Sequence, residues 1–123
     1  MNTLLQIVIG LLAVPLGALG VRSMFLPTNM GDAVGLTPNG VPGLSEIRSV
    51  LGGLFLASVA MIVTGLATDD TTWFLAVAVI MTAAAIGRLV SLATDGPSRE
   101  VLPPLLVEIV IAGILIVGHY ALS

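Results

Sequence analysis

Four long apolar stretches separated by short polar segments make up most of this chain of 123 residues. They run over about residues 4–25, 45–67, 72–94 and 103–121. A helix needs roughly 20 consecutive, mostly apolar residues to cross a bilayer, and each stretch is close to that length. The pattern therefore predicts an all-α fold, an integral membrane four-helix bundle that forms one domain over residues 1–123. Its first span is interpreted as retained, because no Lys or Arg precedes it as in a signal peptide.

Polar and helix-breaking residues predict where these spans begin and end. Ser45 is a suitable cap for the second span, and the turn at residues 69–71 caps the third. The sequence Asp-Gly-Pro at residues 95–97 stops the third span, and the prolines at 103–104 suit the first turn of the fourth. Residues 27–43 are rich in Gly, Pro and Asn, so they predict one longer, irregular loop at the membrane surface.

The composition excludes several classes of protein. Hydrophobic residues make up 57% of the chain and charged residues 9%, too little polar surface for a soluble globule of this size. No basic arm is present, so we predict no nucleic-acid partner. Without Cys and with one histidine, His119, the chain offers neither a thiolate cluster nor a bis-histidine site. We therefore predict no cofactor and no metal.

The arginines predict how the spans are oriented. All of them fall in or beside the first and third connections, which share one side of the membrane in a chain with four spans: Arg22, Arg48, Arg88 and Arg99. The positive-inside rule makes that side cytoplasmic and places both termini outside. Trp73 and Tyr120 then lie together at the opposite interface, where aromatic residues are enriched.

Several charged residues fall at a similar depth on different spans. At about 1.5 Å per residue, Arg48 lies about 5 Å inside the second span, Arg88 about 9 Å before the end of the third, and Glu108 about 8 Å into the fourth. A charge at mid-membrane costs roughly 2.5–3.5 kcal/mol on insertion scales, so such groups should turn inward and pair. The predicted charged layer consists of Arg22, Glu46, Arg48, Arg88, Asp95 and Glu108.

Two interpretations of this layer remain open. It can be a structural clasp of ion pairs that holds three helices in register. Alternatively, the pairs surround a polar cavity that binds a headgroup, an anion, a proton or a small amphiphile, because ionisable groups inside membranes often mark such sites. Arg48 and Arg88 would then hold an anionic group, with Glu108 as the ionisable acceptor.

Small residues spaced four apart provide surfaces for close helix packing. Three such ridges occur: Ser49, Gly53 and Ala57; Ala83, Gly87 and Ser91; and Ala13 with Gly17. We expect them to pack inside the molecule rather than form a dimer face.

The charged segments also carry a family resemblance, over Gly43–Arg48, Gly52–Gly53, Gly87–Ser91 and Asp95–Gly96. This pattern resembles a bacterial family of small four-helix membrane proteins known only as a domain of unknown function. It is also distantly similar to DoxX-type membrane proteins, whose second helix has an acidic residue before a Gly-Gly pair. The resemblance implies the four-helix architecture, a bacterial inner membrane location, and importance for Glu46, Arg48, Arg88 and Asp95.

These observations leave two main functions open. The first is a noncatalytic membrane protein that binds or conducts a small polar or amphiphilic ligand at the charged layer, with membrane lipid around it. The alternative is an accessory or scaffold subunit, in which the layer is structural and the ridges dock a second copy or another membrane protein. An enzyme is the least supported class, because no nucleophile–base pair, metal cluster or phosphate loop is visible.

Overall fold

The computed structural model describes residues 2–123, and this part of the chain contains helices and turns but no strand. The elements are α1 (Thr3–Phe25), α2 (Pro27–Val34), α3 (Gly40–Glu46), the π-helical segment η1 (Ile47–Gly52), α4 (Gly53–Thr68), α5 (Thr72–Thr94) and α6 (Leu102–Leu122). Since α3, η1 and α4 form one continuous helix, four helices are long and apolar enough to cross a membrane. The predicted all-α fold is confirmed, and it fits a small multi-pass membrane protein.

The second long helix begins earlier than the sequence predicts. It starts at Gly40, with Asn39 as the preceding residue, so Ser45 lies inside the helix and does not cap it. Pro42 is the third residue of this helix, and a proline there breaks no hydrogen bond because the first four N–H groups have no partner within the helix. The proline that suggested a loop is therefore compatible with the first helical turn.

The predicted irregular loop over residues 27–43 is wrong at both ends, because residues 27–34 form α2 and residues 40–43 belong to α3. Pro27 takes the first position of α2, which ends at Gly35 in the left-handed conformation with φ 78°. Met30 is buried, and a Cβ at Gly31 would lie 2.5 Å from the Leu36 carbonyl oxygen. Proline at the start of a helix and glycine after its end are typical of short helices as well as of loops. The buried side of α2 then stabilises the helix.

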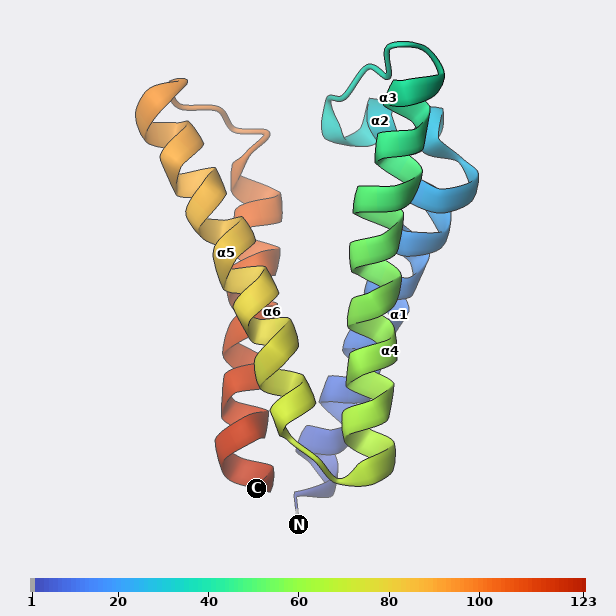
Figure 1. Ribbon diagram of the computed structural model, residues 1–123. Coiled ribbons are helices and arrows are strands. Elements are labelled where there is room, and N and C mark those ends of the chain that lie inside the picture. The colour runs from blue at the N-terminus through green and yellow to red at the C-terminus, as the bar shows by residue number, and fades with distance from the viewer. Residues whose placement is uncertain (1) are drawn as a thin grey trace.

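The long helices form two hairpins (Figure 1). In one, α1 packs against η1 and α4; in the other, α5 packs against α6. The hairpins lie close together where both chain termini and the α4–α5 turn are found, and they diverge toward the opposite end. We call these the termini end and the arginine end, because the latter carries Arg22, Arg48, Arg88 and Arg99. The buried core includes Ile9, Leu16, Ile62, Phe74, Val77, Met81, Ile111 and Leu115.

Glycines explain where the hairpins meet. A Cβ at Gly65 on α4 would lie 2.7 Å from the ring of Phe74 on α5, and one at Gly118 on α6 would lie 2.5 Å from Ile9 on α1. Both close approaches join the two hairpins at the termini end. Toward the arginine end, Gly52 approaches Met24, which joins η1 to α1 within a single hairpin.

Two of the three predicted small-residue ridges do not pack inside the molecule. A Cβ at Gly53 or Gly87 would meet no heavy atom within 4 Å. Their neighbours Ser49, Ala57 and Ala83 are exposed. The third ridge does pack, since Gly17 lies against Val59 of α4. The expected internal packing is therefore wrong for the ridges on η1–α4 and α5, which face outward.

Candidate functional site at the arginine end

The strongest charged contact joins the helices of the second hairpin. Nε of Arg88 on α5 donates to both carboxylate oxygens of Glu108 on α6, at 3.1 and 3.2 Å. Nη2 of Arg88 donates to Oε1 at 3.0 Å. The contact is thus a forked, charge-assisted pair, which fixes the two side chains in orientation as well as in distance. It is the only salt bridge within residues 2–123.

Helical spacing explains why these two residues meet. Arg88 follows the buried residues Met81 and Ala85 by seven and three positions, so it lies on the same face of α5. Glu108 lies three positions after the buried Leu105 and belongs to the buried face of α6. The pair therefore continues the apolar core of this hairpin toward the arginine end.

The divergence of the hairpins leaves this pair partly open. The Glu108 side chain keeps 13% of its surface exposed, whereas Arg88 keeps 40%. At this level α4 and η1 have moved away from α5 (Figure 1). Nε and Nη2 of Arg88 both donate to Glu108. Nη1 of Arg88 has no hydrogen-bond partner among the described residues. An anion could reach that side of the guanidinium.

Arg48 reaches the other helix of the first hairpin. Its Nη1 donates to the backbone oxygen of Met24 at 2.6 Å. Met24 lies in the last turn of α1, where carbonyl groups lack partners within the helix and where the helix dipole favours a cation. Arg48 therefore caps α1 while its exposed guanidinium keeps further N–H groups free.

The remaining layer residues make local contacts or none. Nε of Arg22 donates to Oδ1 of Asn29 at 2.5 Å, which ties α1 to α2. Asp95 accepts a hydrogen bond from Ser91 at 2.9 Å, one turn earlier on α5. The exposed Glu46 side chain has no hydrogen bond or salt bridge to any part of residues 2–123. The structure thus brings Arg88 and Glu108 together and does not join the other four to them through ion pairs.

Some contacts carried no signal in the sequence. The partner of Arg48 is a backbone oxygen, which every residue possesses. Thr71 and His119 meet at the termini end, where Oγ1 of Thr71 lies 3.1 Å from Nδ1 of His119. These residues are 48 positions apart. Only the packing of α6 beside the α4–α5 turn brings them together.

Comparison of the sequence with models of protein families identifies one family. A family model described as a domain of unknown function, DUF4345, matches residues 4–119. The chain belongs to the DUF4345 family. No curated protein and no solved structure matches it. The likeness to DoxX-type proteins therefore stays a prediction.

All six residues of the predicted layer lie within the matched DUF4345 segment. The arginine end of this DUF4345 protein carries both guanidinium and carboxylate groups. No group of three His, Cys, Asp or Glu side chains within residues 2–123 could hold a metal ion. The guanidinium groups, by contrast, offer several N–H donors that contact no carboxylate, because each arginine carries five.

Proposed function

We propose that this protein is a noncatalytic membrane protein that binds an anionic amphiphile at the arginine end. The observation that carries the proposal is the position of Arg88. It lies on the inner face of one hairpin, is held in a fixed orientation by Glu108, and keeps 40% of its side chain exposed where the other hairpin diverges. A held but accessible guanidinium is suited to phosphate or carboxylate, because it offers planar paired donors.

Arg48 supplies a second cationic group at the same end. It uses one N–H on Met24 and is otherwise exposed, so it can contact an anionic headgroup without losing its contact with α1. Exposed apolar side chains such as Ile86, Leu89 and Leu106 lie on the spans below this end. They would contact the chains of the same amphiphile or of membrane lipid.

The proposal includes an orientation in a bacterial inner membrane. With the arginine end cytoplasmic, Trp73 and Tyr120 lie at the outer interface and both termini are outside. The chain contains no Cys, so T28C and S123C variants each provide a single thiol for labelling. We expect a membrane-impermeant maleimide to label S123C on intact cells and T28C only after lysis. Labelling with the opposite preference would reverse the proposed orientation.

Ligand binding can be tested with defined lipids. The protein would be released from mild detergent micelles containing either phosphatidylglycerol or phosphatidylcholine, and retained lipid measured by native mass spectrometry. We expect preferential retention of phosphatidylglycerol. The substitutions R48Q and R88Q should each weaken it by about ten- to hundredfold, since a hydrogen bond to a charged group contributes roughly 1.5–3 kcal/mol.

The control for this experiment is R99Q. It removes the same charge at the same end, from the exposed connection between α5 and α6. Phosphatidylglycerol retention should be unchanged in this variant. Equal retention of both lipids by the unmodified protein, or equal losses in all three variants, would reject a specific site.

The outward ridges favour a second candidate function, that of an accessory or scaffold subunit. Gly53 and Gly87 have open space above them, and small residues of this kind let another helix approach closely. The G87I variant would block such an approach. We expect it to abolish cross-linking to a second copy or to a co-purified membrane protein, whereas G113I, at another open position, should not. A stable lone monomer after mild extraction would reject this function.

A further inference from the structure

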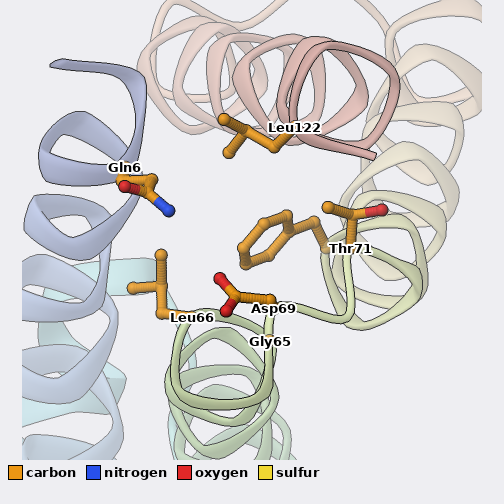
Figure 2. Close-up of a pocket in the computed structure, with 7 residues that line it drawn as sticks. Gln6, Gly65, Leu66, Asp69, Thr71 and Leu122 are labelled. Atoms are coloured by element: carbon orange, nitrogen blue, oxygen red, sulfur yellow. The ribbon is translucent and has the colours of Figure 1, made fainter. Parts of the chain in front are cut away.

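A small cavity lies at the termini end, where all four long helices meet (Figure 2). Its volume is about 10 Å³. Gln6 of α1, Phe74 of α5 and Leu122 of α6 line it, together with Asp69 and Thr71 of the α4–α5 turn. The cavity therefore touches both hairpins at the point where they are joined.

Two polar side chains point into this space without a partner. The amide nitrogen of Gln6 and the carboxylate of Asp69 both point toward the middle of the cavity (Figure 2). Neither side chain makes a hydrogen bond to any other group within residues 2–123. The hydroxyl of Thr71, by contrast, is already bonded to His119. Gln6 is half-buried and Asp69 is exposed at the open side of the cavity, so a donor and an acceptor without protein partners lie on opposite sides of one small space.

We propose that a single water molecule occupies this cavity and bridges Gln6 to Asp69. A water molecule needs roughly 10–15 Å³ of such space and two to four polar partners, and the cavity provides about the minimum of both. The water would accept a hydrogen bond from Nε2 of Gln6 and donate one to the Asp69 carboxylate. An amphiphile, or any other ligand clearly larger than water, does not fit in this volume.

The backbone at Asp69 is consistent with this role. Asp69 has φ 55°, the left-handed conformation, and it is the one non-glycine residue with positive φ within residues 2–123. This conformation is unfavourable for most side chains, although Asp and Asn tolerate it. It ends α4 and directs the carboxylate into the cavity (Figure 2).

The water bridge would fix the α4–α5 turn from the side of α1. The contact between Thr71 and His119 fixes the same turn from the side of α6. The bridge would act within the first hairpin and the Thr71–His119 contact within the second, on either side of the turn that joins the hairpins and independently of any ligand at the arginine end. This bridge is therefore a structural binding site for water that ties α1 to the end of α4 within the first hairpin.

A double-mutant cycle tests the bridge in the full-length protein. D69G removes the carboxylate and keeps the backbone unstrained, because glycine adopts positive φ freely. Q6L removes the amide on the other side. Because the relief of backbone strain by glycine is common to both backgrounds, we expect the Tm change caused by D69G to be about 3–5 °C more negative in the unmodified protein than in the Q6L background. Equal shifts in both backgrounds would overturn the proposal.

The neighbouring residue Asp70 provides the matched control. Its Oδ1 accepts a hydrogen bond from the backbone N–H of Thr72 at 3.0 Å, a contact that does not involve Gln6. D70G should therefore lower the Tm by the same amount in both backgrounds. If D70G were also coupled to Q6L, the coupling would reflect the turn as a whole, and the assignment to a bridge at Asp69 would fail.

A second measurement distinguishes water from a small cation. The Tm would be compared in sodium, potassium and N-methylglucamine chloride at equal ionic strength. We expect no difference between the three salts, and we expect D69N to keep most of the coupling to Gln6, because its amide oxygen can still accept from water. A Tm increase specific to sodium or potassium, lost in D69N, would overturn the assignment to water.

Discussion

Removal of the Glu108 carboxylate should destabilise the protein measurably. Exposed ion pairs contribute about 0.2–1 kcal/mol, whereas breaking a buried pair costs about 3–5 kcal/mol. Arg88 and Glu108 lie between these limits, because the carboxylate is nearly enclosed and the guanidinium is 40% exposed. Three N–O contacts of 3.0–3.2 Å would be lost together. We therefore expect E108L to cost about 1–3 kcal/mol, a decrease in Tm of about 4–12 °C.

The double variant R88M/E108L shows whether the pair acts as a unit. Replacing both partners of an ion pair by apolar residues of similar size is often neutral, because no charge is left without its partner. We expect the unfolding temperature of this variant in detergent to return to within about 5 °C of the unmodified protein. E100L, at an exposed position in the α5–α6 connection, serves as the control and should change little. If the losses from R88M and E108L simply added, the two residues would not be coupled, contrary to our reasoning.

Three further predictions concern helix packing and capping. G65A should lower the Tm in the same assay by several degrees, because its Cβ would lie 2.7 Å from the Phe74 ring and overpacking costs about 1–3 kcal/mol. G113A, which meets nothing within 4 Å, should raise the Tm slightly, because alanine is favoured over glycine in a helix by about 0.8–1 kcal/mol. R48Q should cost about 1 kcal/mol through weaker capping of α1 at Met24, measured as faster amide exchange in the last turn of α1.

The sequence predicted the four long helices well, because each is a continuous apolar stretch of membrane-spanning length. It failed where one residue type is compatible with two local structures. Pro27 and Pro42 suggested a loop, yet each occupies a first helical turn. The π-helical segment over Ile47–Gly52 was not predicted, because no sequence pattern distinguishes it from the α-helix that it continues.

The candidate site was predicted only in part, for a physical reason. The depth of Arg88 and Glu108 along their spans assigned both to the charged layer, and the structure places them in contact. Arg48 has the same depth and charge, but its partner is the Met24 backbone oxygen. Depth along a span restricts which groups can meet across a membrane. It does not say which helices are neighbours, and that depends on the close approaches between them.

The distribution of close approaches accounts for the accessibility of the ion pair. Gly65 and Gly118 permit close contact between the hairpins at the termini end. Near the arginines, Gly52 permits a close approach between η1 and α1, which belong to the same hairpin. Arg88 therefore faces a region where no helix of the first hairpin supplies an apolar cover. An apolar residue at this position would face the opening without a packing partner, whereas an arginine held by Glu108 can be hydrated or bind an anion there. The charge is located where the packing of the four helices leaves one side of the Arg88 guanidinium uncovered.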